Sequence, residues 1–542
     1  MRPCRRLSPK NEARVILLLF CVWSIIAASC THREEIDKTG FIQIENDHFT
    51  LEGKEFFPIM LNYVVQFQND EAGNFIFCPF IDYDSLNYYE AVGKAEIAEQ
   101  IRGHFRLIKD LGFNTLRICI DRIASNSQGQ FFYQTAKNKR FYLDNPEHID
   151  AILQGLNELV EIAHSEGLKV MLLIKSPATH LSVEHFTVKM LQYFKDNPTI
   201  FAYDFMNEPL YFDADARRTK EEVCTLVNHW KNLMTLNAPR QLFTVGLAEP
   251  IEVFTWDPSM LPVDFIEFHT YHPLRVPSEI YWYSTYSKKP WIVGETSLPA
   301  DKDSITYQEY IQFLADAYQL VRDAGGSGFG WWEFQDVQGM NFEHSFTGLL
   351  NHEGETFTND GKYKIFGTLK IPRNMIDSLE AHYIPKKKTR PVNYFNMLGY
   401  SNICITGTIL DAHTRQPVEG AVIRGWNLYW SVGVNTYSDE NGKFTLFCND
   451  PCCHFKISAP GRSTWINDRQ LQYTPTVKTE DDVHQLPDRE REYHQISYHG
   501  FIQQNDTTHH SIFNFDPTLF NRYNWTANMG VILLDQKQNI NH

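Results

Sequence analysis

Eight short apolar segments, each followed by a longer segment of helical periodicity, constrain the fold of this chain more than any other feature. In one of the longer segments Ile149, Ile152, Leu156, Leu159 and Ala163 recur every three or four residues and so share one helical face. Alternation of strands and helices is typical of parallel sheets. Eight such repeats predict an α/β fold, a (β/α)8 barrel over residues 41–385 with strands at 56–62, 114–120, 169–175, 200–206, 242–247, 264–270, 291–294 and 328–332.

The pattern changes after residue 385. Prolines at 385 and 391 bracket three lysines, which is typical of a solvated linker, assigned to residues 386–402. The polar segment 464–525 is interpreted as an insertion before the last strand, and residues 69–89 as a loop insertion of the barrel. Short strands separated by turns predict a small C-terminal β-sandwich over residues 403–542, with strands at 403–410, 421–426, 443–448, 454–459 and 530–534.

The first thirty residues have the layout of an export signal. Basic residues precede an uncharged run from 15 to 29, and this run is shorter than the ~20 residues that a membrane span needs. It ends in Ala27-Ala28-Ser29-Cys30, which resembles the lipobox of bacterial lipoproteins. We therefore predict a signal peptide over 1–30, a lipid on Cys30 and a tether over 31–40. The resemblance implies an exported protein anchored to a membrane, at the outer membrane or cell surface of a Gram-negative bacterium; a plainly cleaved signal and an uncleaved anchor are the alternatives.

Charge and cysteine content narrow the choice of ligands. The formal net charge is −16 and no basic stripe interrupts the acidic balance, so the electrostatic footprint of a nucleic-acid-binding protein is missing. An uncharged or weakly charged ligand fits better.

Cys404, Cys448, Cys452 and Cys453 cluster late in the chain, where one or two disulfides can form in an exported protein and a zinc site is the alternative.

Two glutamates stand at the ends of barrel strands. Glu208 follows the fourth strand in Asn207-Glu208-Pro209, and Glu295 ends the seventh. Residues at the carboxyl ends of barrel strands point into the mouth, where catalysis takes place in this fold. Retaining glycosidases need two carboxyls about 5 to 5.5 Å apart, one to attack the anomeric carbon and one to protonate the leaving oxygen. No HExxH or other paired metal-ligand spacing occurs, so neither a metal nor a cofactor is predicted.

The residues at the strand ends resemble those of clan A glycoside hydrolases, and most of all family five, the cellulase and mannanase family. The resemblance covers about residues 41–335. It implies that Glu208 is the acid/base and Glu295 the nucleophile. It also implies a set of substrate-binding residues: Arg117 beside the nucleophile, Asn207 at the sugar 2-hydroxyl, His269 and Tyr271 of the strand-six motif, and Trp331 and Trp332 of the strand-eight motif. Residues 404–461 resemble the carboxypeptidase regulatory-like domain.

Other polar residues near the strand ends are assigned less direct roles. Asp204 and Glu267 are expected to point the other way along their strands and to be structural or helix-facing. His272 and Glu333 are expected at the subsites or behind them. No histidine follows the third strand at 173–176, a feature in which the chain resembles the mannanase branch more than many cellulases.

The sequence thus predicts a retaining glycoside hydrolase that cleaves β-linked polysaccharide or oligosaccharide, of the β-mannan or β-glucan type, within the polymer. An exo-acting β-glycosidase, whose insertion at 69–89 closes one end of the cleft, is one alternative. A non-catalytic glycan-binding lipoprotein is the other. For the sandwich a spacer role is favoured over carbohydrate binding, because the sequence there offers no obvious planar aromatic trio.

Overall fold

The computed structural model describes residues 38–69, 74–80, 93–120, 123–135, 139–174, 181–213, 215, 217–301, 305–337, 346–400, 402–468, 471–472, 474–477 and 523–536. The chain divides into residues 1–39 and 40–542, and the second unit is the one described below. The predicted signal peptide, Cys30 and most of the tether lie outside the described residues, so the export and lipid-anchor assignments stay predictions. Among the described helices, none is both long enough and apolar enough to cross a membrane.

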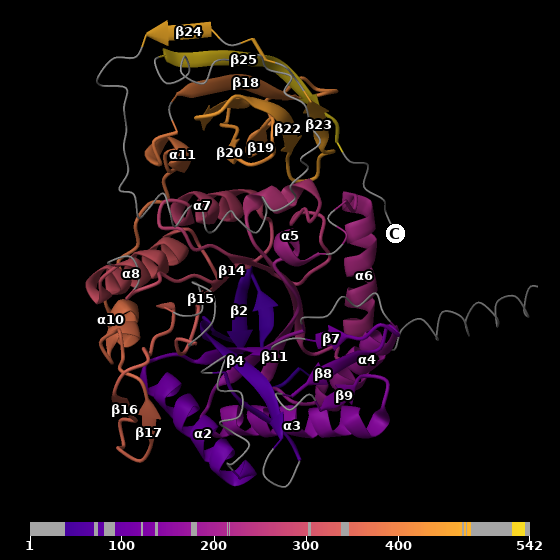
Figure 1. Ribbon diagram of the computed structural model, residues 1–542, viewed down its shortest axis with the longest axis vertical. Coiled ribbons are helices and arrows are strands. Elements are labelled where there is room, and N and C mark those ends of the chain that lie inside the picture. The colour runs from indigo at the N-terminus through magenta and orange to yellow at the C-terminus, as the bar shows by residue number, and fades with distance from the viewer. Residues whose placement is uncertain are drawn as a thin grey trace, which may run out of the picture. The chain divides into compact units, whose positions relative to one another are not determined.

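Eight parallel strands close into a barrel. β15 pairs in parallel with β4, which completes the ring (Figure 1). All eight predicted strands are present, so the (β/α)8 barrel is confirmed. Around the ring they are β4 (Ile59–Asn69), β6 (Thr115–Ile120), β10 (Lys169–Leu173), β11 (Ile200–Asn207), β12 (Leu242–Leu247), β13 (Ile266–His269), β14 (Trp291–Glu295) and β15 (Gly328–Trp331).

Helical connections join consecutive strands. Thr219 and Thr306 begin two of the helices with capping boxes, in which each threonine and a glutamate three residues later satisfy one another's backbone donors. The connection between β12 and β13 contains only a 3-10 turn, η2 (Pro250–Phe254). The α-helices between strands are α2 (Lys94–Asp110), α3 (Pro146–Ser165), α4 (Leu181–Phe194), α5 (Pro209–Phe212), α6 (Lys220–Asn237), α7 (Val276–Tyr286) and α8 (Tyr307–Asp323).

An N-terminal antiparallel sheet plugs the amino end of the barrel. It consists of β1 (Gln43–Glu45), β2 (His48–Leu51) and β3 (Lys54–Glu55). Phe49 of β2 lies edge-on to Phe201 and Phe265, with ring centroids 6.1 and 5.1 Å apart. These rings pack with Met60, Met171, Ala202 and Ile292 from the barrel strands. Because this end is apolar and closed, the polar side chains of the interior collect toward the opposite end.

The predicted loop insertion at 69–89 is wrong in part, because the described portion of it is a strand. β5 (Phe75–Pro79) pairs antiparallel with the end of β4. Its phenylalanines are buried in the main hydrophobic cluster, with Phe77 lying against the face of α3 at Gly155. A further small sheet, β7 (Ile123–Ser125), β8 (Phe131–Gln134) and β9 (Arg140–Tyr142), follows β6. Residues 81–92 lie outside the described part of the chain.

Beyond the barrel, a hairpin and two short helices precede the last sheets. The hairpin is β16 (Glu355–Phe357) with β17 (Lys364–Phe366), and α10 (Met375–Ala381) follows it. The predicted linker 386–402 contains α11 (Tyr394–Met397). Tyr394 and Phe395 of α11 are buried in the hydrophobic cluster of the C-terminal sheets. This segment therefore packs onto the sandwich instead of only connecting it.

Two four-stranded sheets share the C-terminal hydrophobic cluster and form the predicted β-sandwich. One sheet has the order β21 (Lys443–Cys448), β18 (Ile403–Asp411), β25 (Tyr523–Leu534), β24 (Thr474–Val477). The other has the order β20 (Gly433–Tyr437), β19 (Val422–Asn427), β22 (Cys452–Ser458), β23 (Trp465–Asp468). The five predicted strands are present. β23 and β24 lie in the segment interpreted only as an insertion, which corrects that interpretation.

None of the cysteines in the described residues, including the late cluster of four, is joined in a disulfide. Burial raises the pKa of Cys448 well above its usual range, and the neighbouring Cys452 raises it further. Among the described residues, no cysteine belongs to a group of three or more side chains that could hold a metal ion. The structure therefore records neither the disulfides nor the zinc site considered for this cluster.

Candidate active site

Glu208 and Glu295 come together at the carboxyl end of the barrel. Glu208 directly follows β11, and Glu295 is the last residue of β14. One carboxylate oxygen of each and a ring nitrogen of His269 all lie within 4.8 Å of one another. The side chain of Glu208 is 16% exposed and that of Glu295 is 4% exposed. The two carboxylates therefore face a common point from two sides of the mouth, one more solvated than the other.

The backbone of Glu208 adopts a conformation that L-residues rarely take. Its φ and ψ are 46° and 69°, in the left-handed region, and Pro209 then begins α5. The Glu208 N–H donates to the carbonyl of Gly246 at 2.8 Å, which holds this bend against β12. Such backbone strain costs on the order of 1–3 kcal/mol and clusters at functional sites. The bend turns the Glu208 side chain toward His269 and the mouth.

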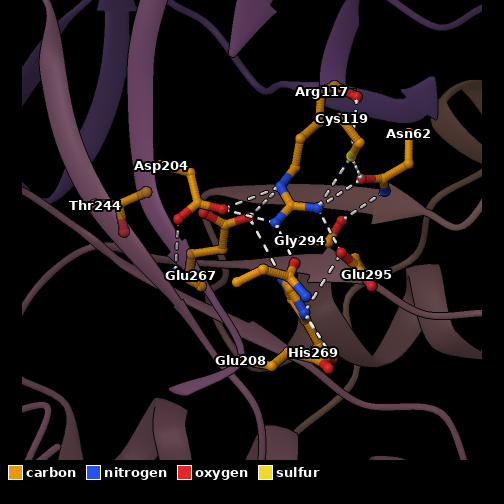
Figure 2. A network of polar contacts seen from close by, with 12 residues as sticks. Asn62, Arg117, Cys119, Asp204, Glu208, Thr244, Glu267, His269, Gly294 and Glu295 are labelled. Atoms are coloured by element: carbon orange, nitrogen blue, oxygen red, sulfur yellow. Dashed lines mark hydrogen bonds and ion pairs between the residues drawn. The ribbon is translucent and has the colours of Figure 1, made fainter. Parts of the chain in front are cut away.

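Glu295 is held as an anion. Nη1 of Arg117 donates to its carboxylate (Figure 2), and so does the hydroxyl of Tyr271. Burial raises the pKa of Glu295, but the positive charges of His269 and Arg117 and these two hydrogen bonds outweigh burial, and the pKa falls below its ordinary value. A carboxylate with a lowered pKa stays ionised at neutral pH.

Arg117 lies at the centre of the polar network and is completely buried. Its guanidinium is 2.6 Å from the carboxylate of Asp204 and 3.1 Å from that of Glu267, and it donates to Asn62 at 2.9 Å and to Asn207 at 3.0 Å. Figure 2 shows the guanidinium surrounded by Asn62, Asp204, Glu267 and Glu295. Arg117 therefore positions other residues; the expectation that it binds substrate directly is corrected, because no part of its side chain reaches the surface.

Asp204 and Glu267 are structural residues that point into the barrel, so of the two alternatives expected for them the helix-facing one is wrong. Both side chains are fully buried inside the barrel beside Arg117. Successive side chains of a strand alternate between its two faces. Glu267 thus shares the inward face of β13 with His269, two residues later, and Asp204 occupies the corresponding inward position on β11. Burial and the nearby Glu267 raise the pKa of Asp204 to about 7, and Arg117 opposes the rise.

His269 bridges the two glutamates. Its Nδ1 lies 2.9 Å from Oε1 of Glu208 and 3.5 Å from Oε1 of Glu295, and its Nε2 lies 3.7 Å from Glu267. Burial lowers the pKa of His269, but the surrounding carboxylates raise it more strongly, to about 10. A Cβ on Gly246 would lie only 3.0 Å from Nε2, so glycine gives the ring its space. His269 is therefore a buried imidazolium that positions the carboxylates.

The trio of Glu208, His269 and Glu295 is also the one group of potential metal ligands found among the described residues. A metal ligand histidine must be neutral, whereas the carboxylates hold His269 in its charged form. Glu295 already accepts hydrogen bonds from Arg117 and Tyr271. These residues fit an ion-paired network better than a metal centre.

Only one of the two predicted tryptophans faces the mouth. Trp332 packs with Val64, Cys119 and Leu173 at the top of the barrel, with Tyr271 against the same cluster. Trp331 is fully buried, and its Nε1–H donates to the hydroxyl of Tyr310 at 2.8 Å. Because adjacent residues of a strand point to opposite faces, Trp331 lies among the outer helices. Its assignment to the substrate is therefore wrong.

Two glutamates that the sequence did not single out hold the segment that follows Glu208. Leu210 N–H donates to Glu252 at 2.7 Å, and the hydroxyl of Tyr211 donates to Glu249 at 2.7 Å. Burial raises the pKa of Glu252 to about 8. Glu249 lies two residues beyond the end of β12, so the strand-end rule that selected Glu208 could also have selected it.

No family model matches the chain, and no curated protein matches it. Among solved structures it is similar to an exo-β-1,4-mannosidase from Opitutaceae bacterium strain TAV5, at 17% identity over 64% of this chain and 62% of that one, with a TM-score of 0.43. It is also similar to β-glucuronidase 2 of Bacteroides uniformis (12% identity, 79% and 48% covered, 0.41) and to a β-glucosidase from Thermotoga maritima (9%, 62% and 99%, 0.40). The chain spans less than two thirds of the mannosidase and about half of the glucuronidase. This likeness concerns the fold.

Arg117→Met should destabilise the protein strongly. It removes the positive charge beside three buried carboxylates, and breaking a buried ion pair in this way costs about 3–5 kcal/mol. The free energy of unfolding in urea measures the loss. Arg373→Met, at an exposed arginine, is the matched control and should change the value by less than about 1 kcal/mol. Equal losses in the two variants would contradict the central role of Arg117.

Proposed function

We propose that this protein is a β-glycoside hydrolase that works with retention of anomeric configuration. One observation carries the proposal: two carboxylates at the carboxyl ends of β11 and β14 approach each other across the barrel mouth, with oxygens within 4.8 Å. Inverting enzymes keep about 6.5–9.5 Å between the two carboxyls to make room for a water, whereas retaining enzymes need about 5–5.5 Å. The short separation supports the retaining arrangement.

Glu295 is proposed as the nucleophile and Glu208 as the acid/base. An oxygen of Glu295 attacks the anomeric carbon while the glycosidic C–O bond breaks and Glu208 gives its proton to the departing oxygen. Water then loses a proton to Glu208 and attacks the same carbon, which releases Glu295. The lowered pKa of Glu295 suits the first role. His269 Nδ1–H donates to Oε1 of Glu208, which leaves Oε2 to carry the transferred proton.

The surrounding residues are proposed to position the reacting groups. Arg117 and Tyr271 hold Glu295 ionised and fix its orientation through two donors. Asn207 accepts from Arg117 through Oδ1, so its amide N–H₂ is oriented for the sugar 2-hydroxyl. Trp332 offers its ring to the sugar at the mouth. All the positions that catalysis needs are occupied, which disfavours the non-catalytic glycan-binding alternative.

A β-mannan or β-glucan chain, cleaved internally, is the proposed substrate, and no cofactor is required. The exo-acting alternative depends on the insertion at 69–89, of which residues 70–73 and 81–89 lie outside the described part of the chain. Products sized over time separate the two modes, because an exo-acting enzyme releases only one small product from the start. The lipid anchor on Cys30, and with it a location at the outer membrane or cell surface, belongs to the same proposal and rests on the sequence of residues 1–30.

Glu208→Ala should slow substrates with poor leaving groups by about 10²–10⁴-fold, the usual contribution of general acid–base catalysis. Aryl glycosides with good leaving groups need little protonation, so their first step should be spared, and added azide should partly restore their turnover by replacing water. Initial rates on a polysaccharide and on a 4-nitrophenyl glycoside measure both effects. Glu353→Ala, at an exposed glutamate, is the control. Equal slowing of both substrates would remove Glu208 from the acid/base role.

Tyr271→Phe should move the acidic limb of the pH profile of kcat/KM to higher pH. The hydroxyl donates to the ionised form of Glu295 and helps to lower its pKa. Without it the pKa rises, so the nucleophile becomes protonated at a higher pH than in the parent enzyme. The exposed Tyr193 provides the control variant Tyr193→Phe. An acidic limb that stays in place would show that Tyr271 does not act on the nucleophile.

A further inference from the structure

The segment that leads into β19 contacts the end of helix α7 of the barrel, and β19 runs from there toward residues that precede α7. Near the end of α7 the hydroxyl of Tyr286 donates to Glu419 at 2.9 Å, and Trp282 Nε1–H donates to the carbonyl of Gly420 at 3.0 Å. Before the start of α7, Arg275 lies 2.7 Å from Glu249. α7 begins at the mouth, since it follows the carboxyl end of β13. β19 therefore advances toward the mouth.

Arg424 shows where β19 comes close to the residues at the barrel mouth. Its Nη1 lies 4.0 Å from Oε2 of Glu249, the residue that accepts from Tyr211 just after the candidate acid/base. Each further residue of a strand adds about 3.3 Å. The three remaining residues of β19 thus carry the chain about 10 Å beyond this level. This direction would bring the loop that follows, residues 428–432, to the side of the mouth.

This loop presents aromatic rings on a stiff support. Trp430 stacks on His454 with ring centroids 4.1 Å apart and an interplanar angle of 16°, and its centroid lies 5.3 Å from that of Trp426. Tyr429 beside it is 59% exposed. Trp430 has a φ of 57°, in the left-handed region. We name residues 428–432 the aromatic platform.

The backbone of the aromatic platform is held by one asparagine. Oδ1 of Asn427 accepts from the N–H of Ser431 at 3.0 Å and of Val432 at 3.2 Å, and Trp430 N–H donates to the Asn427 carbonyl at 3.1 Å. His454 lies 3.4 Å from the carbonyl of Leu428. A surface fixed before binding loses little conformational entropy when a ligand arrives.

We propose that the aromatic platform binds a sugar unit of the same glycan chain, several units away from the bond that the barrel cleaves. The occupant rests on the proposed function. Flat aromatic faces with polar edges suit the C–H face of a sugar ring, and the net charge of −16 disfavours polyanions. The sandwich is then part of the substrate cleft, which replaces the spacer role favoured by the sequence. The stacked pair of Trp430 and His454 was not evident from the sequence, because His454 comes from a different strand, β22.

Affinity electrophoresis of the full chain tests the platform without turnover. Glu295→Gln serves as the parent variant, with konjac glucomannan or barley β-glucan cast in the gel as probes. The parent should be retarded by at least one polysaccharide, and adding Trp430→Ala should raise the dissociation constant about tenfold. Tyr429→Ala should also raise the dissociation constant. Because this side chain is largely exposed, the variant tests the platform even if Trp430→Ala does not fold. Tyr193→Ala, an exposed tyrosine on α4, should leave retardation unchanged.

Two results would overturn the platform: a parent that neither polysaccharide retards, and a Trp430→Ala chain retarded as strongly as its parent. Neither result bears on the proposed hydrolase, because that function is tested separately by the turnover of 4-nitrophenyl glycosides by the unsubstituted enzyme. If the enzyme cleaves the aryl glycoside but its retardation in the gel does not depend on the platform, the proposed hydrolase stands and the platform proposal is wrong.

Discussion

A single buried guanidinium organises the interior of this barrel. Arg117 is surrounded by Asp204, Glu267 and Glu295, and no part of it reaches solvent. Buried charges are tolerated only when they are paired and hydrogen-bonded, so each of these groups depends on the others for its place. The imidazolium of His269 adds a second positive charge on the side facing the mouth. Together they leave Glu295 ionised in a site that would otherwise favour its neutral form.

Hydrophobic periodicity was enough to predict the barrel, and the strand ends that it defined marked the positions of Glu208 and Glu295. The strands of a parallel barrel are buried on both faces, so they appear as apolar runs, and their carboxyl ends define the mouth. The alternation of side chains between the two faces of a strand was not applied to every residue. It places Asp204 and Glu267 on the inward face of their strands, instead of the helix-facing side considered for them, and it places Trp331 on the outward face, away from the substrate role expected for it. β5 was not predicted, because the aromatic segment that contains it has no clear turn residues to mark where a strand begins and ends, and it was therefore interpreted as a loop insertion.

Contacts between segments that are distant in sequence could not be predicted from the chain alone. Arg424 lies beside Glu249, and His454 beneath Trp430, because of how the two sandwich sheets pack and how β19 meets α7. Neither pair has a local sequence signal. The consequence is functional as well as structural, since the segment after Glu208 is supported by Glu249, which the sandwich in turn contacts.

Covalent trapping tests the central claim, that Glu295 is the nucleophile of a retaining hydrolase. A 2-deoxy-2-fluoro β-glycosyl fluoride slows the second step, so the glycosyl-enzyme accumulates and survives proteolysis. Incubation with the gluco and manno forms, followed by peptide mass spectrometry, should add one fluoroglycosyl group to the peptide that contains Glu295, with loss of activity in step. An enzyme that turns over the parent glycoside but remains unlabelled, or carries the label on another residue, would contradict the account.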